Sequence, residues 1–215
     1  MRWLVFLWVG WCAVSAWAGH AYSQFGDIKY PPGFKHFAYV QPDAPKGGRI
    51  RFPMIGGGFD KLNPFTLKGV EPPGLEGLMF DTLLSRSLDE PASAYGLLAH
   101  DISVASDGRS AEFELRPEAR FHNGDPVLAL DVKHSFDKLS SKESAPQYRM
   151  YFSGIASVTV LGDHKVRFDF REVNRELPLV AGNLPVFSHR WGQGKPLDQL
   201  INEVPIGSGP YQLAG

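Results

Sequence analysis

The stretch FELRPEARFHNGDPVLALDVKHSF, residues 113–136, carries the signals of a strand, a tight turn and a helix in succession. Its first residues complete a predicted strand over 110–115. Asn123-Gly124 predicts the turn, because both residues tolerate positive φ angles. Apolar residues at helical spacing then predict a helix from Ala129 to Leu139. This order predicts a chain of the α/β class.

Polar side chains in the same stretch raise the alternative of a metal or acid–base site. His122, Asp125, Asp131 and His134 lie close together in the sequence, and the last two share one face of the predicted helix. An exported metal-dependent hydrolase using His122, Asp125 and His134 is therefore the alternative function. The chain has no H-E-x-x-H motif, and Asp131 also suits the first turn of a helix electrostatically. We therefore favour a structural role for these residues.

Two strand pairs surround the predicted helix. Strands over 101–105 and 110–115 flank a turn signal, and strands over 158–161 and 165–170 flank Gly162-Asp163. Val166, Phe168 and Phe170 alternate with polar residues, which is typical of a strand with one buried face. Residues 85–182 are therefore expected to form a compact β-rich subdomain.

The segments on either side, 19–84 and 183–215, are expected to belong to one other domain that the β-rich unit interrupts. Four elements are predicted in them: a strand over 49–55, a helix over 75–84, a short helix over 197–204 and a strand entered from the turn in PIGSGPYQL, residues 205–213.

The first 18 residues are typical of a signal peptide. Arg2 precedes an apolar run from Trp3 to Val14, and Ala16-Trp17-Ala18 places small residues at both positions that a signal peptidase reads. The run is too short for a stable transmembrane anchor, so we expect export to the periplasm and cleavage after Ala18. A retained hydrophobic anchor is the alternative. The single cysteine lies in this segment, so cleavage would leave no thiol for disulfides, catalysis or metal binding.

Composition and motifs argue against several other functions. The formal net charge of −1 gives no reason to expect binding to nucleic acid. Gly207-Ser208-Gly209 resembles a nucleophile elbow, but Pro210 prevents the helix that such an elbow requires. Gly56-Gly57-Gly58 lacks the residues of a phosphate-binding loop and more plausibly allows a close backbone approach. We therefore expect no enzymatic activity and no cofactor.

Two features could contact a ligand. Lys68-Gly69-Val70 lies between LNPFT and a pair of prolines, so its extended backbone could pair with an extended peptide, although a plain surface loop explains it equally well. Tyr148 follows the predicted helix and is a candidate exposed contact.

Several motifs, in the right order, resemble family 5 of the extracellular solute-binding proteins. The first is the opening stretch, with Leu115-Arg116, then FHNG at 121–124, Pro126, and ALDV at 129–132. Others are GSGPY at 207–211, FDKLNPF at 59–65 and FDTLL at 80–84. The segment FGDIKYPPGFKHFAYVQPDAPKGG is similar to the subgroup of oligopeptide-binding components that serves microcin C-type peptide uptake.

The resemblance implies a type II periplasmic binding protein, of which this chain would hold lobe I with its inserted β-rich subdomain. Such a protein serves an ABC importer, works with membrane permease subunits, and binds an oligopeptide or peptide conjugate by its backbone between two lobes. It also implies ligand contacts from Lys68, Gly69, Val70 and Tyr148, and we expect a monomer.

The chain departs from the family pattern in two ways. Leu128 stands where a Ser or Thr usually caps the helix, and we expect Asp125 to replace that cap. Members of the family are also longer, so we expect this chain to be a truncated product or a fragment without the second lobe, with weak peptide binding or none. A stand-alone adhesion or scaffold domain is a further alternative.

Overall fold

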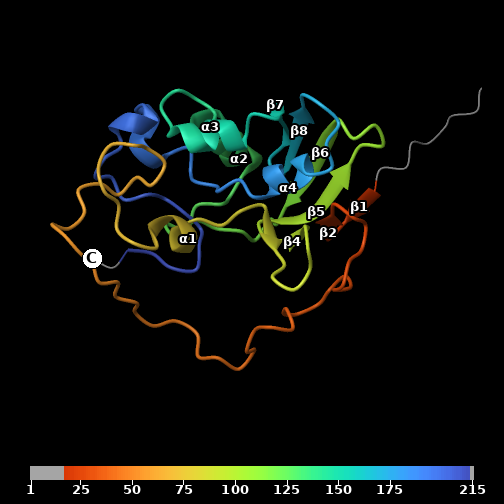
Figure 1. Cartoon of the computed structure of the whole chain (residues 1–215), viewed down its shortest axis with the longest axis horizontal. Helices are drawn as coiled ribbons and strands as arrows, with labels where there is room; N and C mark the ends of the chain where they lie inside the picture. The colour runs from red at the N-terminus through yellow and green to blue at the C-terminus, as the bar shows by residue number, and fades with distance from the viewer. Residues whose placement is uncertain (1–16, 214–215) are drawn as a thin grey trace, which may run out of the picture.

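The computed structural model describes residues 17–213, and its two antiparallel sheets lie toward the right of the molecule in Figure 1. The larger sheet has five strands, in the order β1 (Trp17–Gly19), β5 (Ala99–Val104), β6 (Ser110–Leu115), β8 (Lys165–Phe170) and β7 (Ile155–Gly162). The smaller sheet has three strands, in the order β2 (Ala21–Ser23), β4 (Ser93–Gly96) and β3 (Leu84–Arg86). The mixed α/β class is therefore confirmed.

Both predicted strand pairs are confirmed as neighbours in the larger sheet. β5 pairs with β6, and β7 pairs with β8, each in antiparallel register. Val166 and Phe168 of β8 are buried, whereas Lys165 and Arg167 are exposed, as the alternation predicts.

α2 (Ala129–Leu139) has the predicted bounds and packs against β7 and β8. Its buried face includes Val132 and Phe136, and the Phe136 ring lies edge-on to Phe168 with 6.3 Å between centroids. The apolar spacing read from the sequence therefore identified both the helix and the face that it buries.

The predicted cap of α2 by Asp125 is wrong. The carboxylate of Asp131, in the first turn, accepts the backbone N–H of Leu128 at 2.8 Å. Asp125 instead pairs with Arg190 at 3.0 Å. Leu128 has no polar side chain that could cap the helix. The carboxylate of Asp131 instead satisfies one backbone N–H at this end of the helix.

The predicted helix over 75–84 is shorter than expected. α1 (Leu75–Met79) ends where Phe80 turns to an extended conformation. The carbonyl of Leu78 accepts the N–H of Tyr211 at 3.0 Å, and the carbonyl of Met79 accepts the N–H of Gly209 at 2.9 Å. The carbonyls that would be free at the helix end are therefore satisfied by a distant segment.

Three other predictions near the ends of the chain need correction. Residues 49–55 form no strand, because no backbone in the described part of the chain pairs with them, and Ile55 is 100% exposed. The helix over 197–204 is reduced to a 3₁₀ turn at Leu197–Gln199. Residues 205–213 form no strand and bend at Gly209-Pro210, and their backbone hydrogen bonds go to separate segments.

Two short helices complete the architecture. α3 (Pro146–Tyr151) follows α2, and α4 (Leu177–Gly182) packs against the three-stranded sheet. A 3₁₀ turn at Trp191–Gly194 brings Trp191 into an aromatic group with Phe65, Phe80 and Phe187. This group ties the segments before and after the β-rich region into one core.

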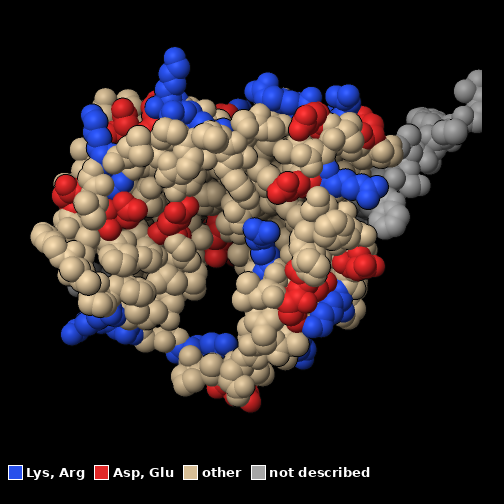
Figure 2. Space-filling view, viewed as in Figure 1, with Lys and Arg blue, Asp and Glu red and all other residues tan. Residues whose placement is uncertain are grey.

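The segment after β2 is held against the body as far as Tyr39, whose hydroxyl accepts the N–H of Leu88, and then runs outside it. The Lys29 and Tyr30 side chains donate to the carboxylate of Asp89, and Tyr95 donates to Glu90. Beyond this anchor, the orange part of the chain follows the lower edge of the molecule in Figure 1. Figure 2 shows an open space between that segment and the body, with acidic and basic residues intermixed on this face.

Within residues 17–213, no helix combines the length and apolarity needed to cross a bilayer. Residues 1–16 of the predicted signal peptide lie outside the described part of the chain, and the predicted cleavage after Ala18 falls within β1.

Candidate functional site

The His and Asp side chains of the opening stretch do not converge on one point. His122 Nε2 lies 2.8 Å from the carbonyl oxygen of Gly209, and the ring of His134 lies edge-on to Phe187. Asp131, 1% exposed, accepts the backbone N–H and the Nδ1 of His189 at 2.9 and 2.7 Å.

The metal-dependent hydrolase therefore gains no support from these residues. No group of three or more His, Cys, Asp or Glu suited to a metal ion occurs between residues 17 and 213. Burial also lowers the pKa of His134, which makes its imidazole a weaker base. Each side chain instead holds one element of the fold to another.

The GSG segment owes its glycines to close packing against α1. A Cβ on Gly207 would overlap the carbonyl oxygen of Met79, and one on Gly209 would lie 2.5 Å from the carbonyl oxygen of Leu78. Ser208 lies in an irregular segment that is followed by a bend and not by a helix, unlike a nucleophile elbow. The motif therefore lets the backbone reach the end of α1.

A groove lies between α1 and α3 and is formed by two adjoining cavities of about 410 and 230 Å³. The cavities share Glu76, Asn183 and Pro185. The larger is also lined by Gly77, Phe80, Asp81, Thr82, Leu97 and Pro210, and the smaller by Gln147, Tyr148, Tyr151 and Phe152. We call this feature the α1–α3 groove. It combines aromatic walls with a few polar groups, as ligand sites do.

Tyr148 lies in this groove, held from behind by the core. Its ring is edge-on to Phe65, with 5.4 Å between centroids. Burial raises the pKa of the Tyr148 hydroxyl, and the nearby negative charge of Glu76 raises it further. The hydroxyl therefore stays protonated and remains a hydrogen-bond donor.

The loop with Lys68, Gly69 and Val70 is exposed but tightly organised. The N–H of Val70 donates to Asp60 Oδ1 at 2.6 Å, and its carbonyl accepts the N–H of Asp60 at 3.0 Å. Gly69 has φ +85°, and a Cβ there would lie 2.6 Å from Asp60 Oδ1. The backbone groups of Val70 are thus occupied within the loop, whereas Lys68 and Gly69 form no backbone hydrogen bond with another part of the described chain.

A buried lysine holds this loop in place. Lys61, 2% exposed, donates to the carbonyl of Thr66 at 2.5 Å and pairs with Glu71 at 3.1 Å. The loop also contacts the start of α3, because the carbonyl of Phe65 accepts the N–H of Ala145 at 2.8 Å. The structure therefore brings the loop and the helix of Tyr148 into contact through Phe65.

Sequence reasoning missed Glu76, Asp81 and Asn183. The two acids lie at polar positions of the segment predicted as a helix, and such positions are ordinarily solvated. Burial raises the pKa of Asp81, and Ser208 and His122 beside it oppose the rise. In the sequence, an acidic residue between apolar helical positions gives only a weak indication of a binding site. Only the tertiary structure shows that these two acids line a groove.

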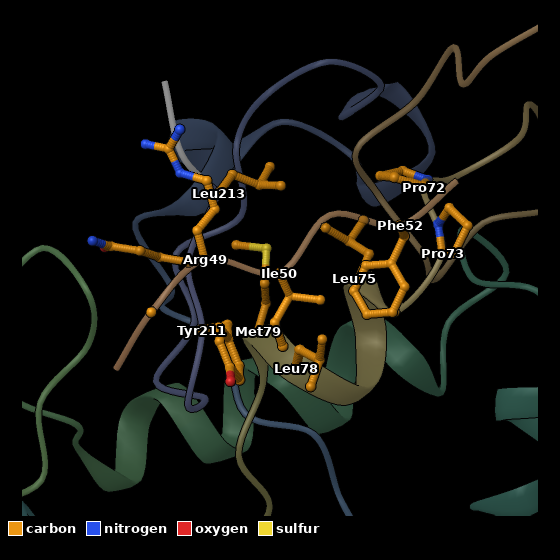
Figure 3. Close-up of a pocket in the computed structure, with 13 residues that line it drawn as sticks. Arg49, Ile50, Phe52, Pro72, Pro73, Leu75, Leu78, Met79, Tyr211 and Leu213 are labelled. Atoms are coloured by element: carbon orange, nitrogen blue, oxygen red, sulfur yellow. The ribbon is translucent and has the colours of Figure 1, made fainter. Parts of the chain in front are cut away.

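A second groove, of about 340 Å³, lies on the other side of α1 (Figure 3). Ile50 and Phe52 of the outlying segment lie over Leu75 and Leu78, as Figure 3 shows. Its walls are largely apolar, and Arg49 at one end is its only charged side chain among the lining residues. It lacks the converging polar groups of the α1–α3 groove, so we assign the candidate site to the latter.

Comparison with known proteins gives the same family as the sequence motifs. Residues 93–215 match the model of bacterial extracellular solute-binding proteins, family 5. A probable peptide-binding protein YejA of Agrobacterium fabrum is 40% identical over 200 residues, covering 89% of this chain and 32% of the relative. An uncharacterised protein, y4wM, of Sinorhizobium fredii is 43% identical over 196 residues, covering 87% of this chain and 29% of the relative. This chain thus spans about a third of the length of these relatives.

Solved structures agree on the fold. NikA from Brucella suis, in complex with Fe(III)-EDTA, aligns with a TM-score of 0.59 and 24% identity, covering 72% of this chain and 31% of that chain. The oligopeptide-binding protein AppA from Bacillus subtilis, in complex with a nonapeptide, aligns with a TM-score of 0.59 and 19% identity, covering 74% and 32%. The architecture is that of part of a type II periplasmic binding protein. The chain belongs to family 5 of the bacterial extracellular solute-binding proteins.

Proposed function

We propose that this chain is part of the periplasmic substrate-binding component of an ABC importer for oligopeptides or peptide conjugates. The observation that carries the proposal is the α1–α3 groove, with Tyr148 on one wall and the loop of Lys68 and Gly69 in contact with the base of that wall. A peptide-binding relative at 40% identity and the fold shared with AppA support it.

In this proposal the ligand is an extended peptide held mainly through its backbone. The Tyr148 hydroxyl, whose hydrogen faces Glu76, accepts a hydrogen bond from a peptide N–H, and the exposed backbone of Lys68 and Gly69 pairs with the peptide as an added strand would. The exposed Val70 side chain contributes apolar contact, because its own backbone groups bind Asp60. The protein performs no catalysis, needs no cofactor and acts as a monomer beside the permease subunits.

A nuclear magnetic resonance titration tests peptide binding. Trialanine is added to the ¹⁵N-labelled chain up to millimolar concentration, since one lobe alone is expected to bind weakly. Backbone signals of Lys68, Gly69 and Tyr148 should shift together with one dissociation constant. Tyr148→Phe should weaken binding about fivefold, in line with one lost hydrogen bond of about 1 kcal/mol. Shifts that avoid both regions would refute the proposed site.

Export is tested separately. The chain is produced in a bacterium with two membranes, and the periplasmic fraction is analysed by mass spectrometry. A mature N-terminus at Gly19 is expected. Recovery of the intact N-terminus in the membrane fraction would favour the retained anchor instead.

A further inference from the structure

Residues 45–55 of the outlying segment have no backbone hydrogen bond to any other part of the described chain. Every residue from 41 to 53 is exposed, and Figure 2 shows open space between this segment and the body. A peptidase must draw an extended stretch of substrate into its cleft, so exposed segments without hydrogen bonds are preferred sites of cleavage. The folded protein therefore already offers a stretch of chain in the form that a peptidase requires.

Three exposed basic residues, Lys46, Arg49 and Arg51, lie within this stretch. The ion pairs found among residues 17–213 all involve other basic side chains. A serine endopeptidase of the trypsin class selects such residues, because a carboxylate at the base of its specificity pocket binds the basic side chain. The side chains of this segment thus match one class of peptidase.

The three positions differ in how closely they contact the body. Ile50 and Phe52, which follow Arg49 and Arg51, lie over α1 in the groove of Figure 3. Lys46 is followed by Gly47 and Gly48, whose φ angles are +80° and +110°. Glycine changes between left-handed and extended conformations at little steric cost, so this part of the segment can adapt to an enzyme cleft. We therefore expect the Lys46–Gly47 bond to be cleaved first.

Basic residues in the regular elements are protected by comparison. Lys133 lies within α2, and Lys165 and Arg167 lie within β8, which is paired on both sides. Cleavage at these positions requires local unfolding of the helix or the sheet, which the native structure disfavours. The outlying segment requires no such step.

Both sides of the segment are fixed to the body. On the amino-terminal side, β2 pairs with β4, and Tyr30, only 8% exposed, donates from its hydroxyl to Asp89 at 2.6 Å and from its N–H to the Tyr95 hydroxyl at 3.2 Å. On the other side, Asn63 and Phe65 are fully buried. A cut between these anchors would leave both pieces with their contacts to the core.

We propose that residues 46–51 form a site of proteolytic processing by a serine endopeptidase specific for basic residues, and that the cleaved chain remains one folded unit. In the first cut, water adds across the Lys46–Gly47 peptide bond and its C–N bond breaks. Lys46 gains a carboxylate and Gly47 gains an amino group. This processing is separate from peptide binding and goes beyond the proposed function.

Limited digestion of the purified chain with trypsin tests the site. The protein is treated in native buffer with a small amount of enzyme, and the fragments are weighed by mass spectrometry at successive times. Within residues 17–213, the first cut should follow Lys46, at least about tenfold faster than cleavage at any basic residue in a helix or strand. The two pieces should elute together in size-exclusion chromatography, and urea unfolding should keep its cooperative transition.

A triple variant separates recognition of the basic side chains from exposure of the segment. Lys46→Gln, Arg49→Gln and Arg51→Gln together should slow the first tryptic cleavage at least about tenfold. Thermolysin, which cuts before large apolar residues, should still cleave this variant before Ile50 or Phe52. That result would show that the segment stays accessible and that only the basic side chains were removed.

Lys133→Gln combined with Arg167→Gln is the matched control, since it removes exposed basic residues from a helix and a strand and should leave the first cleavage unchanged. A first cut elsewhere in residues 17–213, or a triple variant cleaved as fast as the parent, would refute the processing site. Pieces that separate in size-exclusion chromatography would refute the claim that the cleaved chain remains one unit.

Discussion

Gly207→Ala tests the idea that the GSG segment is a site of close backbone contact. The added methyl group would overlap the carbonyl oxygen of Met79 and lie 2.9 Å from its carbonyl carbon, so the segment must move away from α1. That movement strains three hydrogen bonds: Gly209 N–H to Met79, Tyr211 N–H to Leu78, and His122 N–H to the carbonyl of Gly207. At about 1 kcal/mol each, their loss lowers the free energy of unfolding by about 3 kcal/mol.

Urea unfolding followed by tryptophan fluorescence measures this loss, and thermal unfolding should show a decrease of about 6–12 °C for a chain of this size. Gly77→Ala is the control, because a Cβ at Gly77 meets nothing within 4 Å and alanine favours a helix. We expect it to be neutral or to stabilise by up to about 1 kcal/mol. A Gly207→Ala variant within 0.5 kcal/mol of the parent, on the order of ordinary surface substitutions, would refute the reasoning.

Three further predictions concern side chains that hold the fold together. Asp131→Ala should lower the free energy of unfolding in urea by about 2–4 kcal/mol, because two backbone N–H groups lose their acceptor. The exposed Asp137→Ala is the control and should lower it by about 0.5 kcal/mol or less, so equal losses would contradict this prediction. Hydrogen bonds from a lysine, a tyrosine and a serine hold the pKa of Asp89 below its ordinary 3.8. The stability that this carboxylate contributes is therefore present above about pH 4 and is lost as the pH falls further. In Asp89→Asn, the free energy of unfolding should fall less steeply below about pH 4 than in the parent chain. An equal fall in both proteins would contradict this prediction. Lys61→Met removes a hydrogen bond of about 1 kcal/mol from the loop, so the Val70 amide should exchange hydrogen about fivefold faster, and unchanged exchange would show that Lys61 does not hold the loop.

The elements that the sequence predicted well are those specified by their own residues. The helix over 129–139 and the strand over 165–170 have the bounds read from apolar spacing, because each buries one face against a neighbour that is close in the chain. Residues 49–55 show the same alternation, yet they form no strand. A strand is completed only by hydrogen bonds to another segment, and periodicity does not reveal whether that segment is present.

The candidate site was predictable only in part, for a similar reason. The resemblance to family 5 pointed to Tyr148, which lines the α1–α3 groove, and to the loop of Lys68 and Gly69. Glu76 and Asp81 carry no local signal, because an acid near a short helix is ordinarily solvated. They line the groove only because the fold brings Asn183 and Pro210, more than 100 positions away, to the same place.

The opening stretch acts on this groove through the backbone rather than through its own chemistry. His122 hydrogen-bonds to the carbonyls of both Gly207 and Gly209, through its backbone N–H and its ring, and Asp131 holds the backbone of His189. The segment held at Gly209 in turn binds the last carbonyls of α1, the helix that carries Glu76. A substitution that frees this segment should therefore loosen one wall of the groove without touching a ligand. In the proposed site, His122 would therefore act by helping to fix the position of α1, and not by chemistry of its own.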